Sequence, residues 1–199
     1  MSLGRIGVLV NNVGISYSHP EYYADTDPAF HERLVNVNIH SVNKMTHMVL
    51  GHMVENGGGA IVNLSSISGV LPAPLLASYS ASKAYVDFFT QAIASEYEKK
   101  HIVCQSVTPS MVVSAMSKIR RPSATVAHPR VVVNNSLNRL GRGDVSISPF
   151  LMHQVMISAM KILSGYLGQS WMVNKLRDQM VAVRAAAMRR AEREARKSQ

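Results

Sequence analysis

Three short apolar runs, separated by long helical patterns, place the strongest constraint on how this 199-residue chain can fold. The runs are Ile6–Asn11, Ala60–Leu64 and Ile102–Val107, and each is continuous and rich in β-branched residues. Continuous apolar strands are typical of a parallel sheet that helices cover on both faces. The order strand, helix, strand, helix, strand, then helices therefore predicts an α/β fold built on a doubly wound parallel sheet.

Two long helical patterns fill the intervals between the predicted strands. The first covers Pro28–Glu55 and ends at the glycines of residues 57–59, and the second covers Tyr79–Lys99. The segment Ser117–His128 is rich in Ser, Pro and Arg, so we expect it to be the most mobile part of the chain. We expect one compact domain over residues 1–172 and a basic helical tail over residues 173–199.

The net charge of +9 is concentrated at the C-terminus, where eight Lys or Arg residues and three Asp or Glu residues follow position 174. A solvated helix explains this charge, and so does a surface that attracts anionic lipid or phosphate groups. No nucleic-acid-binding motif accompanies the charge, so we do not predict nucleic acid as a partner. The eight histidines lack ligand spacing, so no metal site is predicted, and the single cysteine, Cys104, excludes an internal disulfide.

The most apolar part of the C-terminal region is Ile147–Val173. Gln154, Lys161 and Gln169 interrupt it, so it lacks the roughly 20 uninterrupted apolar residues of a membrane-spanning helix. Its apolar and aromatic side chains fit a surface that lies on a membrane or forms a dimer, and they fit an ordinary core helix equally well.

Tyr79 and Lys83 lie four residues apart in the predicted second helix, so their side chains share one face. Ser66 stands thirteen residues before Tyr79, at the end of the second apolar run. A neighbouring ammonium is expected to lower the pKa of the phenol below its usual value of about 10. A surface pair explains Tyr79 and Lys83 equally simply, but with the serine hydroxyl they predict proton exchange at a substrate oxygen during hydride transfer to the adjacent carbon.

Other landmarks follow in a fixed order. The sequence Asn-Asn-Val-Gly at residues 11–14 ends the first strand, Asn38 lies inside the first helix, and Pro109–Ser114 follows the third strand. Together with the serine and the tyrosine–lysine pair, this order resembles the short-chain dehydrogenase/reductase family. The family pattern contains Asn-Asn-x-Gly, Asn, Ser, Tyr-x-x-x-Lys and Pro-Gly-x-Val-x-Thr.

A narrower resemblance covers nearly the whole chain. Several patches outside the shared catalytic core are similar to the branch that contains very-long-chain 3-oxoacyl-CoA reductases and 17-beta-hydroxysteroid dehydrogenases of types 12 and 3. These patches are Leu9–Tyr17, Pro20–Tyr22, Leu71–Leu76, Phe88–Phe89 and Lys118–Pro122.

The resemblance implies catalytic roles for four residues. Tyr79 would donate a proton to the substrate carbonyl oxygen, and Lys83 would stabilise the phenolate and bind the nicotinamide ribose. Ser66 would bind the substrate carbonyl oxygen, and Asn38 would hold the water that links Lys83 to solvent. Ser65 and Asn36 are the alternatives to Ser66 and Asn38; the family spacing favours Ser66, and the match of residues 37–39 to the family helix favours Asn38.

The resemblance also implies NADP as cofactor, with Asn12 and Gly14 beside the adenosine ribose and Tyr79 and Lys83 beside the nicotinamide. Val112 and Ser114 would meet the nicotinamide carboxamide, while residues 117–128 would close over the substrate as a lid. The chain departs from the family at Ser110, where glycine is usual, and at Ser114, where threonine is usual. Ser114 keeps the hydroxyl group that the expected contact requires.

The Gly-rich turn that binds the cofactor pyrophosphate is not found in this sequence. The family version, Thr-Gly-x-x-x-Gly-x-Gly, opens a helix, whereas the glycines at 57–59 lie between a helix and a strand. We therefore expect the C-terminal portion of a Rossmann-like sheet, without the N-terminal strands, and weak binding of NADPH by the chain itself. A fragment, a short isoform and a stand-alone remnant all remain open.

The expected activity is NADPH-dependent reduction of a 3-oxoacyl-CoA to a 3-hydroxyacyl-CoA in very-long-chain fatty-acid elongation. The alternatives are a 17-beta-hydroxysteroid dehydrogenase and a catalytically silent chain that acts through binding. An acyl-CoA or steroid substrate, a membrane surface and a homodimer are the expected partners. The tail Arg196–Gln199 resembles a dilysine-type retrieval signal and favours the endoplasmic reticulum membrane.

Overall fold

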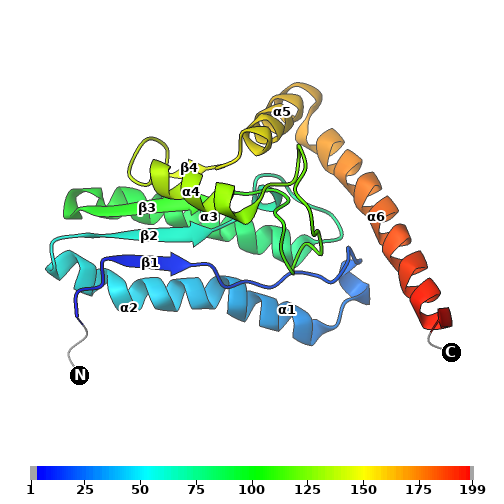
Figure 1. Cartoon of the computed structure of the whole chain (residues 1–199), viewed down its shortest axis with the longest axis horizontal. Helices are drawn as coiled ribbons and strands as arrows, with labels where there is room; N and C mark the ends of the chain where they lie inside the picture. Colours follow the sequence, from blue (N-terminus) through cyan, green and yellow to red (C-terminus); the bar gives the residue numbers. More distant parts are fainter. Residues whose placement is uncertain (1–3, 198–199) are drawn as a thin grey trace.

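A parallel sheet of four strands forms the centre of the computed structural model, which describes residues 4–197. The strands are β1 (Val8–Asn11), β2 (Gly59–Leu64), β3 (Ile102–Val107) and β4 (Ser146–Ile147), and they lie in that order across the sheet (Figure 1). The predicted parallel α/β fold is therefore confirmed.

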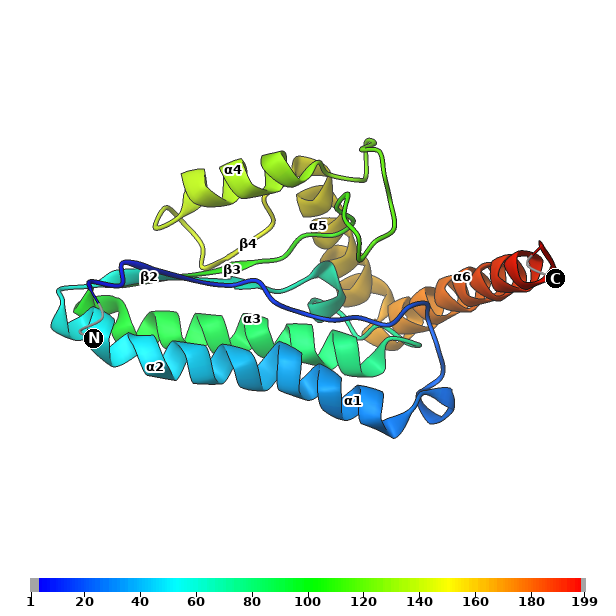
Figure 2. The same ribbon diagram turned by 60° about the horizontal axis from the view of Figure 1, so that its bottom comes forward.

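Helices cover the two faces of the sheet unequally. On one face lie α1 (Pro28–Val35), α2 (Ser41–Glu55) and α3 (Ala77–Tyr97), and on the other lies α4 (Pro129–Arg139) (Figure 2). Short turns of 3-10 helix cover Tyr23–Asp25, Ile67–Gly69 (η3) and Glu98–Lys100.

Adjacent residues of β2 contribute to separate hydrophobic clusters on the two faces of the sheet. Ile61 packs with Met53 of α2 and Cys104 of β3, whereas Val62 packs with Val132 of α4 on the other face. Side chains alternate between the two faces of a strand, so a continuous apolar run supplies both layers.

The first strand is covered on one side. Leu9 packs against the α2 core, and Asn11 donates hydrogen bonds to Asn63 of β2 and Thr46 of α2. Val8 and Val10 point the other way and are 56% and 54% exposed. Because β1 pairs only with β2 in the described sheet, it is also an edge strand.

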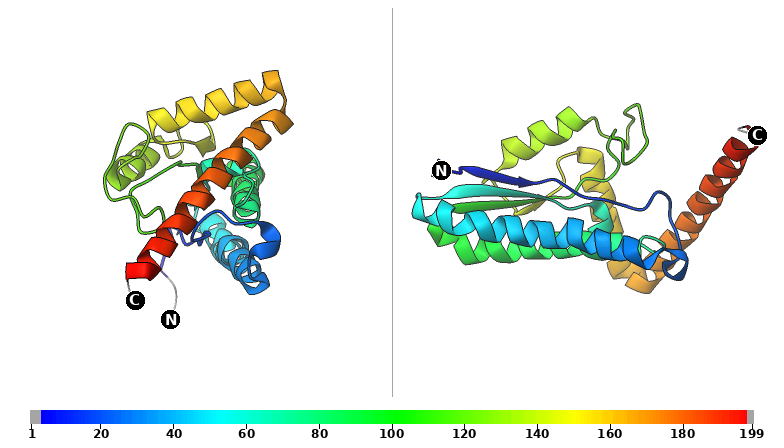
Figure 3. Two further views of the ribbon diagram at one scale, coloured as in Figure 1. Left: turned by 90° about the vertical axis from the view of Figure 1, so that its right-hand side faces the viewer. Right: turned by 90° about the horizontal axis from the view of Figure 1, so that it is seen from below.

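Two long helices follow the sheet. α5 (Leu151–Leu167) and α6 (Gln169–Lys197) form a helical hairpin, and α6 passes on the side toward which the strands point (Figure 3). α5 contributes only His153 to the buried interior and leaves many apolar side chains exposed, among them Leu151, Ile162 and Tyr166. None of the helices within residues 4–197 combines the length and the apolar character that a membrane span requires.

The predicted strands and long helices agree with the structure to within about two residues at most ends. The sequence interpretation did not identify β4 or α4, because a two-residue strand and a short polar helix carry little periodic signal. α6 starts at Gln169, so the expected boundary between residues 172 and 173 falls inside this helix. The last two residues of the expected retrieval tail lie outside the described part of the chain.

Candidate active site

Ser66 takes its position from the end of β2. It is the N-cap of η3, and its Oγ accepts a hydrogen bond of 3.2 Å from the Ser68 backbone N–H. The turn lies directly on α3, since a Cβ added at Gly69 would come within 2.6 Å of the Lys83 carbonyl carbon. This close approach brings the serine beside the helix that carries Tyr79.

The Tyr79 side chain is largely buried and has a side-chain hydrogen bond with Ser66. Burial raises the pKa of Tyr79, and the hydrogen bond with Ser66 only partly opposes that effect. The expectation of a lowered pKa is therefore wrong for this structure. At neutral pH the phenol is therefore protonated.

Lys83 is 7% exposed and lies one helical turn after Tyr79. Its Nζ donates a hydrogen bond of 2.7 Å to the Leu64 carbonyl oxygen and lies 5.8 Å from the centroid of the Tyr79 ring. Burial lowers the pKa of the Lys83 ammonium to about 8. The Lys83 Nζ thus lies over the ring of Tyr79, and the direction of the Tyr79 pKa is set by burial, the larger of the two effects on it.

Asn38 is fully buried in a π-helical turn (η2, Asn36–His40) that joins α1 to α2. π-Helical turns are rare in proteins, and those that occur often lie at functional sites. The Asn38 Oδ1 accepts a hydrogen bond of 2.9 Å from the Ile15 N–H, and its Nδ2 donates to the Ile15 carbonyl at 3.0 Å and to the Ser82 Oγ at 3.1 Å. Asn38 thus fastens the loop after β1 to α3, whereas Asn36 is exposed.

Gly14 lies in that loop, directly over Lys83. A Cβ at this position would be 3.4 Å from the Asn38 Oδ1 and 3.5 Å from the Lys83 Nζ. A glycine here leaves the space beside the ammonium open, which suits the close approach of a ligand.

The other expected cofactor residues lie near the carboxyl ends of the strands, and within residues 4–197 no hydrogen bond joins their side chains to this cluster. Asn12 is exposed. Val112 forms an isolated parallel bridge with Ala127, and the Ser114 Oγ accepts a hydrogen bond of 3.1 Å from the Ser117 N–H. The structure thus brings together Ser66, Tyr79, Lys83, Asn38 and Gly14.

Three serines support this site; Ser80 and Ser82 were not predicted from the sequence as parts of it, and Ser65 was considered only as the alternative to Ser66. Ser65 donates a hydrogen bond of 2.7 Å to the Lys83 carbonyl, Ser80 donates one of 2.6 Å to the Ser68 carbonyl, and Ser82 accepts from Asn38. All three are buried small polar residues beside the predicted catalytic ones. Their proximity in sequence was a signal, but their partners depend on how η3 packs on α3.

Within residues 4–197, no group of three or more His, Cys, Asp or Glu side chains is arranged to hold a metal ion. The free thiol of Cys104 is buried, and burial raises its pKa to about 11. Neither feature adds a second reactive centre to the site.

Comparison with known proteins identifies the family. The family model for short chain dehydrogenases matches residues 1–124. The human very-long-chain 3-oxoacyl-CoA reductase is 42% identical over 165 residues, which are 82% of this chain and 53% of the human protein. The Anas platyrhynchos protein of the same name is 48% identical over 140 residues, 69% of this chain and 45% of that protein.

Solved structures agree with the sequence matches. A short chain dehydrogenase from Burkholderia cenocepacia in complex with NADP superposes with a TM-score of 0.70 and 26% identity, covering 81% of this chain and 68% of that one. A 3-ketoacyl-(acyl-carrier-protein) reductase from Brucella melitensis complexed with NADH gives a TM-score of 0.63 and 26% identity, covering 73% and 64%. The chain spans about half the length of the curated relatives it matches. It belongs to the short-chain dehydrogenase/reductase family, in the branch of the very-long-chain 3-oxoacyl-CoA reductases.

Proposed function

We propose that this chain carries the proton-donating site of an enzyme that reduces the ketone of a 3-oxoacyl-CoA to an alcohol, with NADPH as the reductant. The observation that carries the proposal is the largely buried Tyr79 side chain, which has a side-chain hydrogen bond with Ser66 and a ring centroid 5.8 Å from the Lys83 Nζ. The substrate class is supported by relatives of 41–48% identity that are named very-long-chain 3-oxoacyl-CoA reductases.

Reduction of a ketone needs a hydride at the carbon and a proton at the oxygen, and a bound nicotinamide supplies the hydride. In the proposal, Ser66 and Tyr79 both donate hydrogen bonds to the carbonyl oxygen, which stabilises the negative charge that develops there. Tyr79 then transfers its proton to that oxygen. The raised pKa of Tyr79 keeps the phenol protonated before the reaction.

Lys83 has two roles in the proposal. Its ammonium stabilises the phenolate that Tyr79 becomes after proton transfer, through the field of a charge held 5.8 Å from the ring centroid. Because its pKa is near 8, it can also pass a proton back toward the phenolate at neutral pH. Asn38 holds the loop over Lys83 and so acts as a positioning residue.

The described residues fit the ribose and nicotinamide parts of the cofactor better than its pyrophosphate. The open space at Gly14 beside Lys83 suits the close approach of the cofactor; Asn12 and Gly14 are proposed to border its adenosine ribose, and Val112 and Ser114 to meet its nicotinamide carboxamide. A pyrophosphate binds at a Gly-rich turn that opens a helix. Within residues 4–197, no run of glycines opens a helix. We therefore keep the expectation that the 199-residue chain binds NADPH weakly.

We also propose the endoplasmic reticulum membrane as the location, with acyl-CoA as the partner. The apolar side chains that α5 exposes and the basic end of α6 support a membrane surface. A homodimer is a separate proposal, supported by the exposed Met48 of α2 and Phe88 of α3.

The catalytic proposal is tested in a chimera that joins this chain to the part of the human relative outside the match. We expect Tyr79→Phe to lower kcat by about 10²–10⁴-fold while NADPH affinity stays nearly unchanged, because general acid catalysis contributes that much. Ser66→Ala should also lower kcat, whereas the matched Ser65→Ala should act mainly on stability, since Ser65 bonds to the α3 backbone. A Tyr79→Phe variant that keeps more than about a tenth of the rate would identify another proton donor.

The substrate class is tested by measuring kcat/KM for a long-chain 3-oxoacyl-CoA and a steroid 17-ketone across ionic strength. We expect the acyl-CoA to be preferred, and only its kcat/KM to fall with salt, because CoA is anionic and the chain carries a charge of +9. A steroid preference would favour the 17-beta-hydroxysteroid dehydrogenase alternative. If the unsubstituted chimera reduces neither substrate, the catalytically silent alternative is favoured.

A further inference from the structure

Helix α6 contacts the rest of the molecule along one narrow face. Its partly or fully buried side chains recur about every four residues, and every described residue from Met188 to Lys197 is exposed. This face consists of Met172, Val173, Leu176, Met180, Arg184, Ala185 and Ala187. An arginine therefore occupies a position in a stripe that is otherwise apolar.

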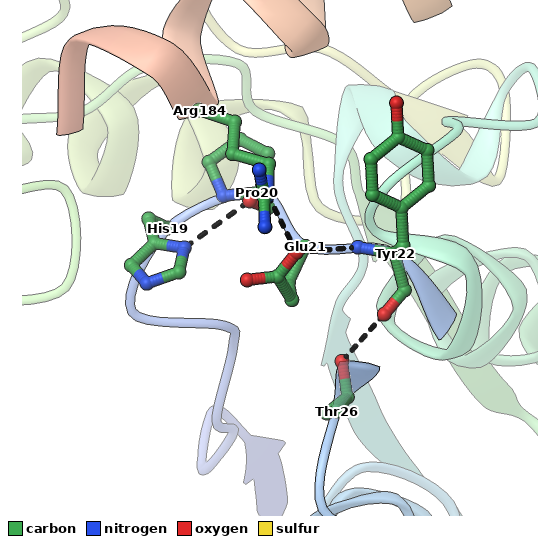
Figure 4. Close-up of polar contacts among 6 residues, drawn as sticks. All are labelled: His19, Pro20, Glu21, Tyr22, Thr26 and Arg184. Atoms are coloured by element: carbon green, nitrogen blue, oxygen red, sulfur yellow. Dashed lines mark hydrogen bonds and ion pairs between the residues drawn. The ribbon is translucent and has the colours of Figure 1, made fainter. Parts of the chain in front are cut away.

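Arg184 meets a carboxylate in the loop between β1 and α1. The Arg184 Nε lies 2.5 Å from the Glu21 Oε1, and the two side chains are only 27% and 15% exposed (Figure 4). The guanidinium carbon also lies 5.4 Å from the centroid of the Tyr22 ring, within the range of a cation–π contact. The hydrogen bond with Arg184 lowers the pKa of Glu21, so the carboxylate is charged at neutral pH.

The loop that Arg184 holds is tied to the site at several points. Its start, Ile15, is bonded through its backbone to Asn38. The Ser18 carbonyl accepts a hydrogen bond of 3.3 Å from the Lys118 Nζ, which lies in the segment expected to form a lid. The Glu21 N–H donates a hydrogen bond of 2.9 Å to the Leu75 carbonyl, four residues before Tyr79.

We propose that α6 is a strap fastened by a clasp between Arg184 and Glu21, and that breaking this clasp releases the strap from the Ile15–Tyr22 loop. Closed, the strap lies on the side toward which the strands point, where ligands of open α/β sheets bind. Open, it frees the loop that connects Gly14 to α1. The inference does not depend on the reaction proposed above.

The chain supplies its own control for the clasp. Arg177 and Asp178 form a second ion pair on α6, with Nη2 and Oδ1 3.0 Å apart, but these side chains are 51% and 60% exposed and adjacent in sequence. Such a surface pair contributes little. Removing its charge changes the electrostatics of α6 without touching the loop.

Thiol labelling measures the opening directly, because the buried Cys104, with its pKa near 11, reacts slowly. Single variants Ala185→Cys and Ala186→Cys place the label on the docked face and on the exposed face of α6. We expect the first to label more slowly than the second. Adding Glu21→Gln should accelerate labelling at position 185 by about threefold and leave position 186 unchanged.

Three further measurements separate a clasp from a general loss of structure. Asp178→Asn should leave both rates unchanged, and the exchanged pair Glu21→Arg with Arg184→Glu should restore slow labelling at position 185. Raising the salt from about 0.01 M to about 1 M should accelerate labelling of the parent at position 185 but not of the Glu21→Gln variant, because salt screens the pair. Circular dichroism verifies that each variant is folded.

Equal labelling at positions 185 and 186 in the parent would show that α6 is not docked. An unchanged rate at position 185 after Glu21→Gln would show that apolar contacts alone hold the strap. Either result overturns the proposal, and neither bears on whether Tyr79 donates a proton.

Discussion

At the scale of single residues, the main feature of the candidate site is the burial of the Lys83 ammonium beside Tyr79. Lys83 shares a helix face with Tyr79, as its spacing requires, but its Nζ is bonded to the Leu64 carbonyl and removed from solvent. The same burial that lowers the pKa of Lys83 raises the pKa of Tyr79. Both shifts favour neutral side chains, so the pair is set for proton transfer rather than for a permanent ion pair.

Replacing Lys83 with a neutral side chain should therefore stabilise the chain at neutral pH. The folded-state pKa, about 8, lies below the value of about 10.4 in an unfolded chain. Below pH 8 both states are protonated, so the folded state bears the full cost of the buried charge, and this cost is relieved as the pH rises from 8 to about 10.4. Lys83→Met should raise the free energy of unfolding at pH 7 by about 1–2 kcal/mol, after about 1 kcal/mol is lost with the hydrogen bond.

Urea denaturation at pH 7 and pH 10 measures this effect. The gain should disappear or reverse at pH 10, and the exposed Lys100→Met should show no such pH dependence. If Lys83→Met raises the free energy of unfolding equally at both pH values, the buried charge of Lys83 does not destabilise the folded chain.

At the scale of elements, the site depends on one close contact between a turn and a helix. η3 carries Ser66 and presses Gly69 against the backbone of α3 at Lys83 and Ala84. Ser65 and Ser80 add hydrogen bonds across the same contact. The position of the turn that carries Ser66, relative to the helix that carries Tyr79, is therefore fixed by backbone packing.

Gly69→Ala should separate η3 from α3 and destabilise the chain by about 1–3 kcal/mol, because the new Cβ would lie within 2.6–2.8 Å of helix backbone atoms. Gly51→Ala is the matched control. Gly51 is exposed in the interior of α2 with nothing within 4 Å of the new Cβ, so this change should stabilise by about 0.5–1 kcal/mol. Chemical denaturation of both variants checks the prediction, which fails if the two substitutions have the same sign.

At the scale of the whole molecule, β1 leaves one edge of the sheet unpaired and one of its faces uncovered. Val8 and Val10 lie on that face, and the described residues place no helix over them. An exposed apolar edge strand is a template for pairing with another chain. The isolated chain should therefore associate with itself as its concentration rises.

Val10→Lys should reduce this association, because a charge on an edge strand opposes strand addition. Ile162→Lys on α5 is the comparison, since Ile162 is 70% exposed but lies on a helix that does not offer free backbone groups. Sedimentation velocity over a range of concentrations measures both. If the β1 edge is the template, only Val10→Lys shifts the chain toward monomer. A larger effect of the substitution on the helix would show that the chains associate through their helices.

The sequence by itself determined the parallel sheet and predicted the residues that the structure brings together at the candidate site. The continuous apolar runs located β1, β2 and β3 because burial on both faces leaves no polar alternation. Ser66 follows β2 and Tyr79 lies in the first turn of the next long helix, α3, so both lie at the carboxyl end of that strand; Tyr79 and Lys83 meet because four residues make about one helical turn. These are local regularities, and local sequence encodes them.

The tertiary structure alone decided the features that depend on distant partners. The direction of the Tyr79 pKa follows from the burial of its side chain, which no spacing reveals. The two-residue strand β4 exists because β3 offers it a free edge. The clasp joins Arg184 to a residue 163 positions earlier in the chain, so it depends on the path of α5 and α6 across the folded molecule. Each of these is set by long-range packing and desolvation, which act only once the chain has folded.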